Sequence, residues 1–101
     1  MTDVGRPKWI QPLQERDPEF VERHFALHQS VLKDGAIPAK YKILMTMVVD
    51  AVVAHPDGCA AIANNARAAG ATEEEINEAV EVAFLVGGNP ALVMAVNAFR
   101  T

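Results

Sequence analysis

Helix-start and helix-stop signals divide most of this sequence into short helical segments. Asp17-Pro18-Glu19 offers a capping side chain, a proline whose missing amide costs nothing, and an acid in the first turn. Apolar residues then recur at helical spacing until Asp34-Gly35. Thr72 and Glu75 have the spacing of a capping box, in which each side chain bonds the other residue's amide. Together the signals predict helices over residues 18–33, 38–54, 59–69, 73–86 and 90–100.

The pattern predicts an all-α fold, because no segment alternates apolar and polar residues as a half-buried strand does. We expect a bundle of about five helices joined by short turns. Residues 1–16 contain prolines and show no helical period, which predicts an extended N-terminal arm followed by a domain over residues 17–101. Trp9, Ile10 and Leu13 of the arm are expected to pack onto the body of this subunit or of a neighbour.

The helix predicted over residues 38–54 is apolar on nearly every side, which is typical of a buried, central helix. Hydrophobic residues make up 50% of the whole chain. A domain of this size leaves much of its surface in water, and monomers rarely expose large apolar patches. We therefore expect copies of the chain to cover one another in a homo-oligomer.

Charge and cysteine content exclude several classes of partner. The chain has 9 basic and 13 acidic residues and a net charge of -4, so it offers no basic stripe for nucleic acid. The apolar run over residues 43–54 is shorter than the roughly 20 residues that span a bilayer, so no membrane partner is expected. One cysteine cannot form an internal disulfide, and no apolar signal segment follows the first residues, so we expect a cytoplasmic location. No cofactor is predicted.

Two stretches carry a resemblance to a known family. Residues 66–76 read as an Ala-rich helix end, Gly-Ala-Thr, acids and Glu-Ile, and residues 81–92 end in Gly-Gly-Asn-Pro-Ala-Leu. In this order and at this distance they resemble the carboxymuconolactone decarboxylase and alkylhydroperoxidase D family. The similarity covers roughly residues 18 to 100 and implies a helical bundle assembled as a trimer or hexamer.

The resemblance also locates where the family's redox residues would fall. Redox members carry Cys-x-x-Cys, a His one turn later and a Glu on the preceding helix, and these positions hold His55, Gly58, Ile62 and Ile43 here. Decarboxylase members keep a His near the Ile62 position, which this chain also lacks. A two-cysteine relay needs two thiols within disulfide reach, so a relay within one chain is excluded.

Three residues are candidates for a remaining catalytic site. Asp50 lies within the apolar second helix, where a buried acid must be paired, and such acids concentrate at functional sites. Alternatively, Asp50 could face a solvent channel or pair with Arg67 or Lys42 of another copy. His55 precedes Cys59 by four residues across a helix start, where a Cys-His pair could activate a thiol. Alternatively, Cys59 is a small apolar residue packed in the core.

Two further residue groups have structural alternatives. His24 and His28 are four residues apart on the first helix, a spacing that could hold a metal with a third ligand, although such pairs are more often surface or interface residues. Asn64, Asn65 and Arg67 are interpreted as a solvated helix face.

Two classes of function follow from these observations. In the first, the chain is a divergent enzyme that acts on a small organic acid, lactone or hydroperoxide in a pocket between the second and third helices. Asp50, His55 and Cys59 would then carry the chemistry. In the second, it is a non-catalytic oligomeric module that kept the scaffold, lost the redox site and binds a small ligand or a partner.

Overall fold

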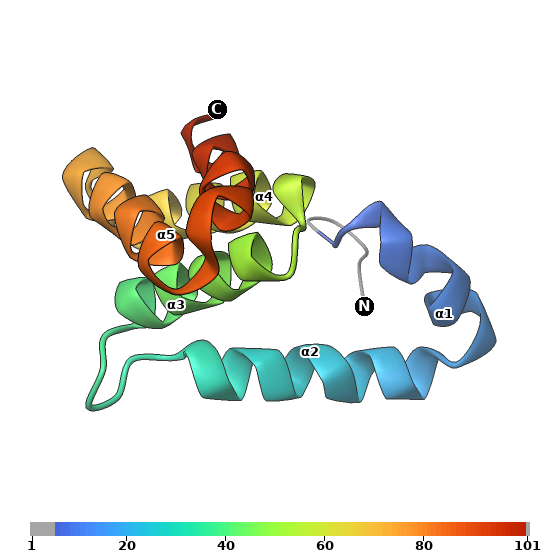
Figure 1. Cartoon of the computed structure of the whole chain (residues 1–101). Helices are drawn as coiled ribbons and strands as arrows, with labels where there is room; N and C mark the ends of the chain where they lie inside the picture. Colours follow the sequence, from blue (N-terminus) through green and yellow to red (C-terminus); the bar gives the residue numbers. More distant parts are fainter. Residues whose placement is uncertain (1–5, 101) are drawn as a thin grey trace. The chain divides into compact units, whose positions relative to one another are not determined.

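The computed structural model describes residues 6–100, and its elements there are all helices (Figure 1). The chain divides between Lys33 and Asp34 into two compact units. The first unit contains η1 (Lys8–Ile10), α1 (Gln11–Arg16) and α2 (Pro18–Leu32). The second contains α3 (Ala39–Val52), α4 (Pro56–Ala68), α5 (Glu73–Ala95) and η2 (Val96–Phe99). The predicted all-α fold is confirmed.

The first unit confirms one prediction and corrects another. The Asp17 carboxylate accepts a hydrogen bond of 3.1 Å from the Phe20 amide, as expected for the cap of α2. The extended arm predicted over residues 1–16 is wrong for Lys8–Arg16, which is helical, while residues 1–5 lie outside the described residues. Pro12 falls in the first turn of α1, where its missing amide breaks no hydrogen bond, so it does not oppose the helix. Ile10 is buried, whereas Trp9 is exposed.

The second unit has its core where α4 and α5 pack against α3, and Figure 1 shows α3 lying beside both helices. The predicted central position of α3 is confirmed, but its burial on every side is wrong. Leu44 and Met47 are buried, whereas Met45 and Val49 are exposed, because the packed helices cover only one side of α3. The fully buried core residues of this unit are Met47, Ala51, Cys59, Ala63, Ala66, Ile76, Ala83, Ala95 and Ala98.

Helix α5 is broken near its middle, as the glycine pair predicted. Gly88 has φ 71° and ψ −163°, a conformation open almost only to glycine, so α5 consists of two helices joined at a kink. The stretch Glu73–Phe99 is long and apolar enough, by length and composition alone, to cross a membrane. The break divides it into pieces shorter than the roughly 20 residues needed, and the first piece supplies Ile76 and Val80 to the core. We therefore describe α5 as a core helix of the second unit.

The start of α5 is tied to the start of α3 through Glu75. Glu75 and Thr72 form the predicted capping box, with Thr72 N–H to Glu75 Oε1 at 2.9 Å and Glu75 N–H to Thr72 Oγ1 at 3.0 Å. The Glu75 carboxylate also pairs with the Lys40 ammonium at 3.1 Å and accepts a hydrogen bond from the Tyr41 hydroxyl. The Thr72 amide, followed by Lys40, lowers the pKa of Glu75. The Glu75 carboxylate therefore links the first turn of α3 to the first turn of α5.

Candidate functional site

Asp50 and His55 are brought together where α3 passes into α4. Asp50 lies in the last turn of α3, and His55 is the residue that precedes α4. The backbone turns so tightly here that the His55 amide donates to the Asp50 carbonyl at 2.9 Å. Their side chains meet as well, with His55 Nδ1 3.4 Å from Asp50 Oδ1. An ionised carboxylate can only accept, so a hydrogen bond in this contact requires the proton to be on Nδ1.

The proton on Nδ1 determines what the rest of the imidazole can do. In a neutral ring with Nδ1 protonated, Nε2 holds a lone pair and can take a proton from a ligand. The Asp50 side chain is 26% exposed and that of His55 is 63% exposed, so the acid is the sheltered member of the pair and the imidazole faces solvent. This is the arrangement of a base that is oriented by a carboxylate behind it.

Gly58 makes room for the Asp50 carboxylate. A Cβ atom on Gly58 would collide with Asp50 Oδ2 and would lie 3.3 Å from the Cβ of His55. Any side chain at position 58 would therefore push the Asp50 carboxylate, which comes from α3, away from the first turn of α4. In the sequence, Gly58 stands out only as one position of the family's cysteine pair. Glycine lowers helix propensity. Its presence in the first turn of α4 indicates that another group approaches the backbone closely there.

Cys59 lies in the core of the second unit, whereas the His55 imidazole faces solvent. Its side chain is fully buried, and its Sγ lies 3.8 Å from the carbonyl oxygen of Met47 in α3. Burial, and secondarily the negative charge of Asp50, raises the pKa of the Cys59 thiol. A raised pKa disfavours the thiolate that nucleophilic and redox chemistry need. Of the two alternatives for Cys59, the geometry favours the packing role.

Two arginines, Arg67 and Arg100, hold the C-terminal segment along α4. Arg100 donates to Asp57 Oδ1 at 2.9 Å, beside the first turn of α4. At the other end of α4, Arg67 pairs with Glu73 at 2.8 Å and donates to the carbonyl of Ala98 at 2.9 Å. The solvated face expected for Arg67 is wrong, since its side chain is only 18% exposed. Its partners Glu73 and Ala98 lie outside α4, 6 and 31 residues further along the chain, which is why spacing along α4 did not reveal them.

The two histidines of α2 do not fit a metal site. Their ring centroids are 5.9 Å apart, but the described residues contain no group of three His, Cys, Asp or Glu side chains that could hold an ion. The Nδ1 atom of His24 is buried and has no hydrogen-bond partner within the described part of the chain. A metal-bound histidine normally donates its other ring N–H to an acceptor. Such an acceptor is missing for the Nδ1 of His24 if Nε2 binds the metal.

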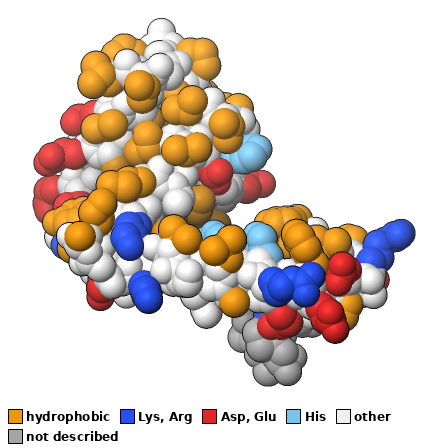
Figure 2. Space-filling model, turned by 90° about the horizontal axis from the view of Figure 1, so that it is seen from below, with side chains coloured by type: hydrophobic (Ala, Val, Ile, Leu, Met, Phe, Trp, Pro, Cys, Tyr) orange, Lys and Arg blue, Asp and Glu red, His pale blue; other side chains and the backbone are white. Residues whose placement is uncertain are grey.

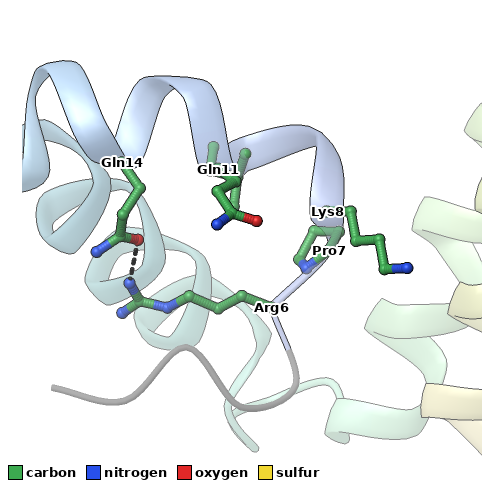
Figure 3. A pocket seen from close by; sticks show the side chains of 6 residues that line it. Arg6, Pro7, Lys8, Gln11 and Gln14 are labelled. Carbon is green, nitrogen blue, oxygen red and sulfur yellow. Dashed lines mark hydrogen bonds between the residues drawn. The ribbon is translucent and has the colours of Figure 1, made fainter.

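Two surface hollows are lined by other residues. One, in the first unit, is lined by Arg6, Pro7, Lys8, Ile10, Gln11 and Gln14. The Arg6 guanidinium donates a hydrogen bond of 2.7 Å to Gln14 Oε1, and Figure 3 marks this bond with a dashed line. The other is an open groove along α5 beside Glu78 and Leu85. Neither hollow contains Asp50, His55 or Cys59.

Comparison with known proteins places the fold and the site in context. The sequence profile described as "Carboxymuconolactone decarboxylase family" matches residues 18–101. The chain belongs to the carboxymuconolactone decarboxylase family. A crystal structure of a protein from Burkholderia xenovorans LB400, provisionally named a carboxymuconolactone decarboxylase, is similar with a TM-score of 0.76 and 28% sequence identity. The similarity covers 93% of this chain and 80% of that one. A comparison with curated proteins found no match.

Within the carboxymuconolactone decarboxylase family, Asp50, His55 and Gly58 can be compared with the cysteine pair of redox members. The resemblance assigns a cysteine pair to positions 55 and 58. In this chain, position 55 holds His55 and position 58 holds Gly58, which has no side chain. The space beside Gly58 is filled by the Asp50 carboxylate. By that resemblance, Asp50 and His55 are in contact at the place where redox members would carry two thiols.

Proposed function

We propose that this family member catalyses proton transfer to or from a small organic acid or lactone, with Asp50 and His55 as its acid–base pair. The observation that carries the proposal is the 3.4 Å contact between His55 Nδ1 and Asp50 Oδ1. The name of the family and of the similar Burkholderia xenovorans protein supports a carboxylactone as the substrate to test first. Hydroperoxide reduction is the less favoured chemistry, because Cys59, the one thiol, is buried.

The proposed chemistry uses His55 as the group that exchanges the proton. In a decarboxylation, the bond between the carboxyl carbon and the lactone breaks, and its electron pair moves into the conjugated ring system as carbon dioxide leaves. Nε2 of His55 first takes up a proton from water, and the resulting imidazolium then gives that proton to the ring carbon that carries the extra electron density. Asp50 keeps Nδ1 protonated and stabilises the imidazolium before the transfer.

The alternative, a non-catalytic oligomeric module that binds a small ligand, is favoured by the openness of the pair. The His55 side chain is 63% exposed in the single chain, and acid–base groups work best where water is excluded.

The cytoplasmic location inferred from the sequence also stays a prediction.

Turnover of carboxymuconolactone by the purified protein distinguishes the two functions. We expect loss of the lactone and release of carbon dioxide without any added dithiol, and we expect Cys59→Ser to keep the activity, because this thiol is a core residue. Lactone binding without turnover would support the non-catalytic module instead. Hydroperoxide consumption that requires a dithiol and is abolished by Cys59→Ser would contradict the acid–base proposal.

A further inference from the structure

Ala54 adopts a backbone conformation that is unusual for an alanine. Its φ angle is 67°, and among the described residues 6–100 it is the only residue other than glycine with a positive φ. A Cβ atom crowds the backbone in this left-handed region, so glycine is the residue that normally occupies it. Such strain persists only where the surrounding structure holds it, and it concentrates at functional sites. Ala54 lies between Asp50 and His55, the two members of the proposed acid–base pair.

The left-handed residue ends α3 and reverses the direction of the chain. The Ala54 amide donates to the Ala51 carbonyl at 3.1 Å, and the His55 amide donates to the Asp50 carbonyl at 2.9 Å. These two bonds form the Schellman motif, which closes a helix with a left-handed residue just beyond its end. Pro56 then disfavours a helical conformation for His55, whose φ of −110° and ψ of 83° lie outside the helical region. Ala54 and Pro56 therefore constrain the backbone on both sides of His55.

The reversal at Ala54 is what brings the two side chains of the pair together. Each residue of an uninterrupted α-helix turns by about 100°, so side chains five positions apart point about 140° away from each other. Asp50 and His55 are five positions apart, yet His55 Nδ1 lies 3.4 Å from Asp50 Oδ1. A helix α3 that continued through residue 55 would separate the imidazole from the carboxylate.

We propose that Ala54 is a positioning residue of the acid–base pair, because its left-handed conformation turns the His55 ring onto the Asp50 carboxylate. Figure 2 shows histidine beside acidic side chains at the surface of the second unit. Ala54 is itself exposed, so a larger side chain at this position meets solvent and acts through the backbone conformation. The effect of Ala54 on turnover rests on the proposed function, whereas its effect on the His55 ring does not.

Glycine substitutions test the conformation of Ala54 through the stability of the protein. Ala54→Gly should raise the urea midpoint, because glycine adopts a φ of 67° without the strain of a Cβ atom. Ala61→Gly, at an exposed position inside α4, is the matched control and should lower the midpoint, because glycine is unfavourable within a helix. An Ala54→Gly midpoint that falls as far as that of the control would contradict the left-handed conformation, and the proposal with it.

Ala54→Val tests the positioning of His55 directly, because a β-branched side chain strongly disfavours the left-handed region. We expect the His55 amide to exchange with solvent about tenfold faster than in the wild type, as its bond to the Asp50 carbonyl opens. In NMR spectra the neutral His55 ring should lose its preference for a proton on Nδ1. Turnover of carboxymuconolactone should fall about 10- to 100-fold as the base loses its orientation. Ala54→Gly should keep the ring tautomer and the turnover of the wild type.

The measurements separate this proposal from the proposed function. A folded Ala54→Val variant that keeps the wild-type tautomer of His55 would overturn the role of Ala54, whatever its turnover. If circular dichroism shows that the valine variant does not fold, the urea midpoints of the two glycine variants decide. A wild-type protein without turnover would instead refute the proposed function, and the His55 ring would still respond to valine at position 54.

Discussion

Replacing Asp50 by asparagine is expected to lower lactone turnover by about 100- to 10,000-fold, the range over which general acid–base catalysis contributes. The change keeps the shape of the side chain and its place beside Gly58. It removes the charge that stabilises the His55 imidazolium. It also places an amide N–H within reach of Nδ1, which allows the ring to adopt the other tautomer. The measurement is the steady-state rate with carboxymuconolactone, with circular dichroism to show that the fold is kept.

Asp57→Asn is the matched control for this experiment. Asp57 is also an acid near the start of α4, but its side chain is 94% exposed and pairs with Arg100. We expect it to change turnover by no more than a few fold, since exposed ion pairs contribute little. Equal losses in the two variants would mean that the rate depends on the local negative charge and not on the contact with His55.

Replacing Ile76 by alanine is expected to lower the free energy of unfolding by about 2–5 kcal/mol, the usual cost of such a truncation in a core. Ile76 is 0% exposed and belongs to the cluster formed by α3, α4 and α5. The loss combines the transfer of buried methyl groups with the cavity that remains, because the helices around it close only in part. Urea unfolding at one fixed protein concentration measures the change, since association would otherwise shift the midpoint.

Leu85→Ala on the same helix provides the comparison for Ile76→Ala. Leu85 is 81% exposed, so its truncation should change the free energy of unfolding by less than about 0.5 kcal/mol. A larger loss at Leu85 than at Ile76 would show that α5 packs with a different face than the one described.

The helix ends that carry local signals could be predicted, whereas α4 begins at Pro56 and not at residue 59. The Asp17 cap, the Thr72–Glu75 capping box and the break at Gly88 each depend on backbone groups only a few residues away. The helical segment Lys8–Arg16 was missed because it is too short to show an apolar period and contains a proline. In its position within the first turn, that proline is compatible with a helix.

The contacts of the site were only partly predictable. Asp50 and His55 were found as polar residues where the pattern demanded apolar ones or a turn, and the structure brings them into contact. The place of Asp50 against Gly58 depends on how α3 and α4 meet, which no spacing within either helix encodes. For the same reason the exposed side of α3 could not be told from its buried side. Apolar residues lie on nearly every side of α3, so its few polar residues, such as Thr46 and Asp50, do not mark the outward face.

The tautomer of the His55 ring tests the central claim most directly, since it requires neither a substrate nor a variant. Long-range ¹⁵N–¹H correlation spectra of the neutral imidazole distinguish a proton on Nδ1 from one on Nε2. The contact with the Asp50 carboxylate predicts that Nδ1 carries the proton and that Nε2 is the free base. A neutral ring that carries its proton on Nε2 would contradict the pairing of Asp50 with His55 and the acid–base function built on it.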